Sequence, residues 1–435
     1  MSASRPDADP ATLFAVVPDR ERIALAVSGG SDSMALLHLA RLWGGPALHV
    51  LTVDHGLRPG SAEEAARVAA FCARHGIAHE TLHWRREGTG GNLPDEARTA
   101  RYSLMANACA AQGTDTLLTG HTMDDQAETV LLRLGRGSGV DGLAAMRPVT
   151  DLWSLRIVRP LLGLRRMDLR RMLAGAGIGW SDDPTNEDRR YRRIAARDAL
   201  EALAPVGIAP DRLAATAEAM ADAREVLERC ADQLAGMACD VSPLGYVVLR
   251  PAALAAVPRE TARRLLARLL CAVSGNPYRP RLDALSGLLA RIAEHGFAGA
   301  TLHGCRVDPV AQGVAIQREP GACIADSPLS SVRTVWDGRF VIDASPTMAG
   351  HGLRVSATGE DGLRLLKSEG APLPVAWTAA PRPARLCTPA LRRGPDLLAV
   401  PLAGWFRTPE ASECRVSARS LPGLATVDPD GEAFI

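Results

Sequence analysis

The N-terminal third of the chain alternates short apolar runs with longer segments of helical periodicity. Apolar runs of strand length occur at 23–27, 47–53, 77–84 and 115–121. Helical patterns follow them at 33–42, 61–76, 94–113 and 124–134. Strands separated by helix-length segments are typical of right-handed βαβ units and a parallel sheet. The pattern therefore predicts a doubly wound α/β domain.

Two of these helices carry start and stop signals. Ser61 followed by Glu64 predicts a capping box, and Gly76 predicts the end of that helix. The next helix is predicted to be entered through Asn92 and Pro94 and to end at Gly113.

Beyond this region the pattern changes twice. A glycine-rich loop and a mixed apolar segment lead to basic helices predicted within 165–174 and 181–200. Residues 205–295 have helical periodicity, and from about 300 onward short β-like runs alternate with Gly and Pro. We therefore expect an α/β domain over 1–205, a helical domain over 206–298 and a small strand-rich module over 299–435.

Composition narrows the class of protein. The 435 residues include 50 basic and 49 acidic ones, and this balance excludes a globally basic nucleic-acid coat but leaves room for local basic patches. The nine cysteines are widely spaced and contain no C-x-x-C, which argues against a zinc ribbon, an iron–sulfur site or a disulfide framework. We expect reduced thiols in a cytoplasmic protein. The N-terminus does not resemble a signal peptide, and no apolar stretch approaches the ~18 residues of a membrane span.

The first predicted strand and helix are joined by the SGGSDS loop, which consists of Ser28, Gly29, Gly30, Ser31, Asp32 and Ser33. A helix N-terminus binds phosphate because it presents free N–H groups and a positive dipole end. The two glycines let the backbone approach an anion closely, and the serines add hydroxyl donors. Asp32 is placed to hold Mg²⁺ beside the phosphates. A plain Ser/Gly turn with an aspartate cap is the alternative, but the position between strand and helix favours a phosphate site.

Two further segments bring charged residues towards the same sheet edge. Asp54 and His55 follow the second strand, where the alternative is a structural strand-end cap. Glu96, Arg98 and Arg101 lie in the first turns of a helix, where cations oppose the helix dipole. We expect these arginines to neutralise phosphate or adenylate charge, and a solvated charged face is the alternative.

The fourth strand and the helix after it carry the densest polar cluster. His121 ends the strand, and Asp124, Asp125 and Glu128 follow at the helix start. Asp124 and Glu128 are four residues apart and so share one helix face. Favourable acids at a helix N-terminus explain one or two of these carboxylates but not the histidine beside them. We expect the cluster to hold a cationic substrate or to accept its proton.

Two arginine-rich stretches suit contacts with an RNA backbone, and Tyr191 could stack on a base. An arginine-rich surface is the alternative, because Lys367 is the only lysine. The arginines are Arg156, Arg159, Arg165, Arg166, Arg170 and Arg171 in the first stretch, and Arg189, Arg190, Arg192, Arg193 and Arg197 in the second.

Taken together, these motifs resemble the tRNA(Ile)-lysidine synthetase family of the PP-loop, or N-type ATP pyrophosphatase, superfamily. The matching stretches are SGGSDS, VDHGLR, NLPDEARTARY, GHTMDDQAETVLLRLGRGSGVDGLAAM, RPLLGLRR and WSDDPTNEDRRYRR, in that order. The SGGSDS loop alone marks only the superfamily, whereas the run over 120–146 is far more specific.

The resemblance implies a ligase that forms a carbon–nitrogen bond. ATP would adenylate the C2 oxygen of the wobble cytidine in a tRNA(Ile) with the anticodon CAU, and free L-lysine would then displace AMP to give lysidine. The implied cofactors are ATP and Mg²⁺, and the smaller C-terminal domains would help to recognise the tRNA.

The implied site residues follow the same motifs. The SGGSDS loop, Asp54 and His55 would hold ATP, with Asp32 as the metal ligand. The candidates for binding and deprotonating lysine are Asp124, Asp125 and Glu128. The candidates for stabilising the adenylated intermediate or for holding the anticodon loop are Arg98 and Arg101.

One position departs from the family pattern, because Ile194 stands where an asparagine is expected. Two alternatives remain open: a PP-loop enzyme that thiolates tRNA, which usually has a cysteine pair that this chain lacks, and a non-catalytic nucleotide-binding module. The sequence leaves the oligomeric state open, a homo-oligomer included.

Overall fold

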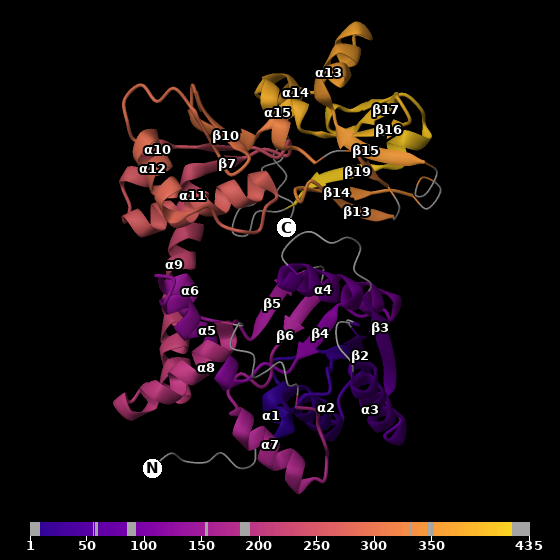
Figure 1. The fold of residues 1–435 in the computed structure, drawn as a ribbon. Helices are drawn as coiled ribbons and strands as arrows, with labels where there is room; N and C mark the ends of the chain where they lie inside the picture. Colours follow the sequence, from indigo (N-terminus) through magenta and orange to yellow (C-terminus); the bar gives the residue numbers. More distant parts are fainter. Residues whose placement is uncertain are drawn as a thin grey trace. The chain divides into compact units, whose positions relative to one another are not determined.

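The structure is a computed structural model that describes residues 9–54, 56, 60–84, 93–152, 155–182, 192–324, 326–329, 332–345, 348 and 352–419, with backbone alone at 93–98 and 192. The chain forms two compact units, Met1–Arg224 and Glu225–Ile435. The division falls within the long helix α9 (Pro210–Ala238) (Figure 1).

The first unit is built on a six-stranded sheet in the order β3-β2-β1-β4-β6-β5. All neighbouring strands are parallel except β5 and β6, which pair antiparallel. The predicted parallel α/β sheet is thus confirmed, and two strands that were not predicted extend it: β6, which is parallel to β4, and the antiparallel edge strand β5. The strands are β1 (Arg22–Ala26), β2 (Ala47–Asp54), β3 (Ala78–His83), β4 (Thr116–Thr119), β5 (Val149–Leu152) and β6 (Leu155–Val158).

Helices cover both faces of this sheet (Figure 1). The helices of the unit that precede α9 are α1 (Pro10–Phe14), α2 (Ser31–Trp43), α3 (Ser61–Arg74), α4 (Leu93–Ala111), α5 (Met123–Leu134), α6 (Val140–Leu143), α7 (Arg166–Gly175) and α8 (Arg192–Leu203). One core joins α1, α2, α3 and α7 to one face through residues such as Phe14, Leu36 and Leu173. A second core packs α4 on the opposite face through Tyr102 and Met105. The sheet is therefore doubly wound.

The strand order reverses beside β1, which pairs with β2 on one side and with β4 on the other. The carboxyl ends of β1 and β4 consequently lie next to each other. In open α/β sheets, ligands bind in the crevice outside such a switch point. The segments that leave these two strands are the SGGSDS loop and residues 120–122.

The caps of two helices differ from the sequence-based expectation. The predicted capping box of Ser61 and Glu64 is wrong, because Ser61 is already the first residue of α3 and the N-cap is Gly60, at φ 93°. A capping box needs its serine one position earlier, outside the helix. The structure instead has one on α5, between Thr122 and Asp125. Gly76, at φ 66°, follows the end of α3 as predicted.

The second unit combines helices with three antiparallel sheets (Figure 1). Its strands are β7 (Cys239–Val241), β8 (Val247–Leu249), β9 (Ala300–Leu302), β10 (Cys305–Val310), β11 (Gly313–Arg318), β12 (Ser327–Pro328), β13 (Arg333–Trp336), β14 (Phe340–Asp343), β15 (Leu353–Ala357), β16 (Pro389–Arg393), β17 (Asp396–Val400), β18 (Trp405–Phe406) and β19 (Arg415–Ala418). Its helices, besides the end of α9, are α10 (Pro251–Ala255), α11 (Arg259–Ser274), α12 (Leu282–Ile292), α13 (Gly359–Ser368), α14 (Val375–Ala379) and α15 (Arg382–Leu386).

The helical and strand-rich segments of this unit share structure. Strands β7 and β8 lie within the segment expected to be helical, and β8 pairs with β11 from the next segment. The helices α11 and α12 and all five strands of that sheet contribute to one core. The strand-rich C-terminal part is confirmed, and the domain boundaries at 205/206 and 298/299 stay predictions.

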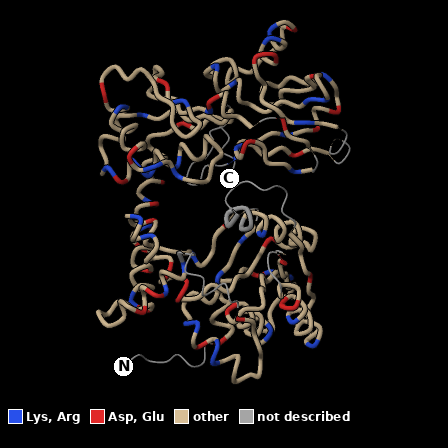
Figure 2. Tube along the Cα trace, in the orientation of Figure 1, with Lys and Arg blue, Asp and Glu red and all other residues tan. Residues whose placement is uncertain are grey.

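Several global expectations can be compared with the described residues. All nine cysteines are free, and six of them are buried. Basic and acidic residues are interspersed over each unit (Figure 2), and the formal net charge of the chain is +1. None of the helices in the described part of the chain has the length and apolar character that a bilayer crossing requires.

Candidate active site

The SGGSDS loop forms a closed turn at the start of α2. The Ser33 hydroxyl donates to the carbonyl oxygen of Gly30 (2.9 Å) and accepts from the backbone N–H of Ser28 (3.2 Å). Gly30 is the N-cap of α2, and no side chain caps its N–H groups. The first-turn N–H groups of a helix have no partner within the helix. The loop therefore presents the donors and the dipole end that an anion needs.

Two glycines allow the close packing around this loop. Gly29 has φ 89°, a conformation that favours glycine. Gly120, at the carboxyl end of β4, lies against the first turn of α2, because a Cβ atom there would be 2.8 Å from the carbonyl oxygen of Asp32 and 3.1 Å from the nitrogen of Ser33. Gly120 thus brings the segment after β4 next to the loop after β1.

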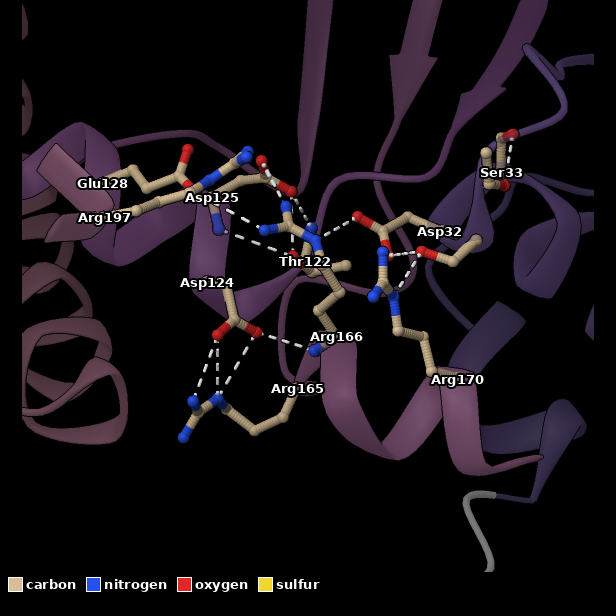
Figure 3. A network of polar contacts seen from close by, with 12 residues as sticks. Asp32, Ser33, Thr122, Asp124, Asp125, Glu128, Arg165, Arg166, Arg170 and Arg197 are labelled. Atoms are coloured by element: carbon tan, nitrogen blue, oxygen red, sulfur yellow. Dashed lines mark hydrogen bonds and ion pairs between the residues drawn. The ribbon is translucent and has the colours of Figure 1, made fainter. Parts of the chain in front are cut away.

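Arg166, the first residue of α7, joins the loop to the acidic cluster of α5 (Figure 3). Its Nε donates to Oδ2 of Asp32 at 2.7 Å, and one terminal nitrogen donates to Oδ1 of Asp125 at 3.0 Å. The other terminal nitrogen lies 3.4 Å from Oε1 of Glu128. One guanidinium therefore holds three carboxylates from two helices, and its side chain is 21% exposed.

Glu128 is the most deeply buried acid of the cluster, with 2% of its side chain exposed. Its Oε1 also accepts from Nε of Arg197 on α8 at 2.5 Å. Its Oε2 is buried and has no hydrogen-bond partner among the described residues. A buried carboxylate oxygen without a partner is costly, so it marks a position where a cation or donor would bind favourably.

Asp124 and Asp125 face different partners. Asp124 accepts from the Arg165 guanidinium at 3.1 Å and from the backbone N–H of Arg166 at 2.7 Å, so it anchors the start of α7. Asp125 accepts from both the backbone N–H and the hydroxyl of Thr122 at 2.8 Å. Asp125 therefore serves the α5 capping box and contacts Arg166 with its other oxygen.

Burial and charge shift the pKa values of the two acids that Arg166 bridges most closely. Burial is the largest influence on Asp32 and, with the nearby charge of Asp125, raises its pKa in spite of Arg166. Burial also acts to raise the pKa of Asp125, but Arg166, Thr122 and His121 outweigh it and hold that pKa below its ordinary value. The groups around Asp125 therefore outweigh the effect of burial on its carboxylate, whereas those around Asp32 do not.

His121 follows β4 beside the same cluster and makes a 2.9 Å hydrogen bond between Nδ1 and the Thr119 hydroxyl. Burial lowers the pKa of His121 to about 4, although Asp125 acts in the opposite direction. Nearby guanidinium groups, including those of Arg101 and Arg193, lower it further. The imidazole is therefore neutral at pH 7.

The remaining predicted site residues are less well connected to the cluster. Asp54 ends β2, and its Oδ1 accepts from the backbone N–H of Gly56 at 2.9 Å. His55 lies outside the described residues, as does the side chain of Arg98. Arg101 is half-buried on α4, with its guanidinium 5.3 Å from the centre of the Tyr102 ring. Its charge still reaches His121.

The arginines of the first arginine-rich stretch have partners within the first unit rather than forming a free basic face. Arg159 is buried and donates to the carbonyl oxygen of Arg147 at 2.8 Å. Arg165 and Arg166 bind the acidic cluster as described above. Arg170 contacts the Ser31 hydroxyl at 3.2 Å and Asp182 at 2.6 Å. The half-buried Arg156 pairs with Asp151, and the exposed Arg171 pairs with Asp168.

The second stretch lies partly outside the described residues, which exclude 183–191 and the side chain of Arg192. Arg193 is exposed, whereas Arg197 reaches Glu128. Ile194 is 7% exposed on α8, which explains why an apolar residue is accommodated at this position.

Sequence reasoning identified the acids but not the cation that organises them. Arg166 is 134 positions from Asp32 in the chain, and the sequence pattern assigned it to RNA contacts. Gly120 and Thr122 were also missed as site residues. The available signal was indirect: buried carboxylates that cluster at a sheet edge require a counter-charge from another element.

The donor chemistry of this cluster fits Mg²⁺ held jointly with phosphates. No three or more His, Cys, Asp or Glu side chains in the described part of the chain group so that they could bind a metal by themselves. Magnesium commonly takes one or two carboxylates, with substrate phosphates and water completing its ligands. Asp32 and Asp125 bond the same guanidinium, so their oxygens already face one cationic position.

Comparisons with known proteins agree with this architecture. A PP-loop domain family matches residues 9–203. A tRNA(Ile)-lysidine synthase of Ruegeria pomeroyi is 41% identical over 396 residues, covering 90% of each chain. Proteins of the same description from Bradyrhizobium and Mesorhizobium japonicum are 40% and 39% identical, covering 71% and 75% of this chain and 93% and 73% of their own.

One similar solved structure is a U34-tRNA thiolase of Methanococcus maripaludis, with 16% identity and a TM-score of 0.43, covering 50% of this chain and 76% of that one. The assignment rests on the sequence relatives and on the domain match. The chain belongs to the tRNA(Ile)-lysidine synthase family, whose members are PP-loop enzymes and carbon–nitrogen ligases.

Proposed function

We propose that this ligase uses ATP to activate the wobble cytidine of a tRNA(Ile) with the anticodon CAU and then joins L-lysine to its C2 carbon. One observation carries the proposal: the SGGSDS loop after β1 and the acidic cluster after β4 meet at the switch point of the sheet through Arg166. A phosphate-binding turn beside carboxylates is the arrangement that a nucleotide and a cationic amine would both need.

In the first step, the loop and the first turn of α2 bind the triphosphate. The free N–H groups after Gly30 face the phosphates, and Gly29 lets the backbone come close. Asp32 would hold Mg²⁺, which would supply charge stabilisation for the departing pyrophosphate. Asp54 and His55, after β2, are further candidates for contacts with ATP.

In the second step, the acidic cluster binds lysine and accepts its proton. The ε-amine has a reference pKa of about 10.4, so it arrives as an ammonium and must lose a proton before it can attack C2. Glu128, whose buried Oε2 has no hydrogen-bond partner in the described part of the chain, and Asp125 are the acceptors that we assign. Asp124 is bound to the start of α7 and acts mainly by positioning that helix.

The arginines of α4 are assigned to the activated nucleotide. The charge of Arg101 reaches the vicinity of His121, so it is placed to stabilise the adenylated intermediate, and Arg98 would assist it or hold the anticodon loop. The tRNA itself would also contact the second unit. The nine free cysteines fit a reducing cytoplasmic location.

The test is to incubate the full chain with ATP, Mg²⁺, labelled lysine and an unmodified tRNA(Ile) transcript with the anticodon CAU. Label in the tRNA, with AMP release that depends on tRNA, is the expected result. ATP binding without AMP release would favour a non-catalytic nucleotide-binding module and refute the proposal.

Single variants separate the two steps. Asp32→Ala is expected to abolish AMP formation, and unchanged AMP formation would refute the phosphate-site assignment. Glu128→Gln is expected to retain AMP formation and to lose lysine transfer, because the neutral amide cannot accept the proton. Arg20→Gln is the control, since Arg20 pairs with Asp115, which precedes β4 and so lies at the opposite end of that strand from the cluster.

A further inference from the structure

The Arg166 guanidinium uses each of its three nitrogens on a different carboxylate (Figure 3). Asp32 belongs to the loop that is assigned to the triphosphate, whereas Asp125 and Glu128 belong to the cluster that is assigned to lysine. The same cation thus occupies both halves of the site when no ligand is bound. A lysine ammonium could not bind Asp125 and Glu128 at this position, because the Arg166 guanidinium already occupies it.

The formal charges of this cluster leave room for one more cation. The three acids Asp32, Asp125 and Glu128 carry three negative charges when ionised, and Arg166 and Arg197 carry two positive ones. In addition, Oε2 of Glu128 is buried without a hydrogen-bond partner among the described residues. Electrostatics therefore favour a further ammonium or metal cation, while the position of Arg166 blocks it.

We propose that Arg166 is a positioning residue that makes lysine binding depend on nucleotide binding. In the free chain it occupies Asp125 and Glu128. When the triphosphate binds at the SGGSDS loop, its phosphates draw the guanidinium towards the loop and free these two carboxylates for the lysine ammonium. The inference rests on the proposed function, because it assumes that both ligands share this site.

The geometry around α7 supports a transfer of this kind. Arg166 already contacts Asp32 in the first turn of α2, at 2.7 Å. Arg170, one helical turn later on the same face of α7, contacts Ser31 at 3.2 Å. Helix α7 thus directs two guanidinium groups at the loop. Arginine binds phosphate oxygens through paired hydrogen bonds, and a triphosphate offers more negative charge than the carboxylates it would replace.

The movement requires only the side chain. The backbone N–H of Arg166 is held by Asp124 at 2.7 Å, and Leu169 and Leu173 of α7 are buried in the core shared with α2. The start of the helix is therefore fixed while the guanidinium, at its accessible end, exchanges partners. The expected consequence is ordered binding, with ATP before lysine, and a reciprocal gain in ATP affinity when lysine is present.

Calorimetric titration of the full chain with L-lysine, with and without Mg²⁺ and a non-hydrolysable ATP analogue, tests the proposal. In the wild type, the analogue is expected to tighten lysine binding by about 5- to 150-fold, the usual range of coupling between two sites. In Arg166→Gln, lysine is expected to bind more tightly than to the wild type without nucleotide, and the analogue is expected to change its affinity by less than about 2-fold.

Two further variants guard against a merely structural explanation. Arg166→Lys retains one positive charge but loses the fork of donors, so partial coupling is expected. Arg171→Gln lies on the same helix outside the cluster and is expected to retain full coupling. Thermal unfolding of each variant identifies any that fails to fold.

The outcomes are distinguishable. If the wild type binds lysine equally well with and without the analogue, or if Arg166→Gln keeps the full coupling, the role of Arg166 is refuted while the proposed function stands. If the wild type binds lysine under neither condition, the proposed function falls together with the inference.

Discussion

Replacing Gly120 by alanine tests whether the two sheet-edge segments must lie as close together as the structure has them. The added Cβ would lie 2.8 Å from the carbonyl oxygen of Asp32, 3.0 Å from its carbonyl carbon and 3.1 Å from the nitrogen of Ser33. Ordinary contact begins near 3.4 Å, so the first turn of α2 must move by about half an ångström. All three atoms belong to the backbone, so no side-chain rotation can relieve the contact.

The cost of this overpacking is expected to be about 1–3 kcal/mol of unfolding free energy. Activity is expected to fall more steeply, because a displacement approaching 1 Å at a reacting centre costs up to about 100-fold in rate. The assay is AMP release at saturating ATP and tRNA, together with urea unfolding of the same preparations.

Gly175→Ala is the matched control, since a Cβ atom there meets nothing within 4 Å. Gly175 ends α7, and alanine is expected to be neutral or slightly stabilising. If Gly120→Ala has wild-type stability and wild-type AMP release, the close approach of β4 to the loop does not position the site, and the reasoning from the switch point is wrong.

Three shorter predictions follow from the same contacts. Ser33→Ala removes the bonds to Ser28 and Gly30 and should cost about 1 kcal/mol in urea unfolding, with weaker ATP binding by titration; unchanged ATP affinity would contradict the role of the turn. Glu128→Gln should cost about 3 kcal/mol in urea unfolding, because two guanidinium groups lose their shared anion, and should weaken lysine binding in calorimetric titration; wild-type lysine affinity would count against the lysine site. The pKa of His121 is about 4 in the folded chain and 6.5 in the unfolded chain, so the unfolded chain binds the proton first on acidification. The contribution of neutral His121 to the free energy of unfolding is therefore present above pH 6.5 and is lost as the pH falls towards 4, and it is on the order of 3 kcal/mol. His121→Gln should flatten the dependence of unfolding free energy on pH in that range, and an identical slope would refute the assignment.

Much of the fold and of the site follows from local pattern. The βαβ rhythm predicts β1, β2, β3 and β4 within a few residues, because a buried strand and an amphipathic helix differ in period over a short window. It does not predict β6, which pairs parallel with β4. The SGGSDS loop and the acids after β4 are likewise visible, since parallel strands bring their carboxyl ends to one edge. That edge is where the structure places Asp32, Asp125 and Glu128.

The errors arise where the deciding contact is non-local or the element is very short. Strands β7 and β8 have three residues each, too few to show a period of two, and they form because β8 pairs with β11 and β7 pairs with β8. The capping box was placed at Ser61 because its pattern fits Ser-x-x-Glu, yet the chain enters α3 through Gly60. The capping box at Thr122 has Asp125 at the position where the sequence pattern requires Glu or Gln, so the pattern does not predict it.

The sequence by itself determined the βαβ order of β1 to β4, the place of the SGGSDS turn between β1 and α2 and the family to which the chain belongs, because these depend on residues adjacent along the chain. The tertiary structure alone decided which charges meet. Arg166 reaches Asp32 across 134 positions, and Arg197 reaches Glu128 across 69. A charge in a folded chain acts on whatever lies within a few ångströms, and packing rather than sequence spacing decides what that is.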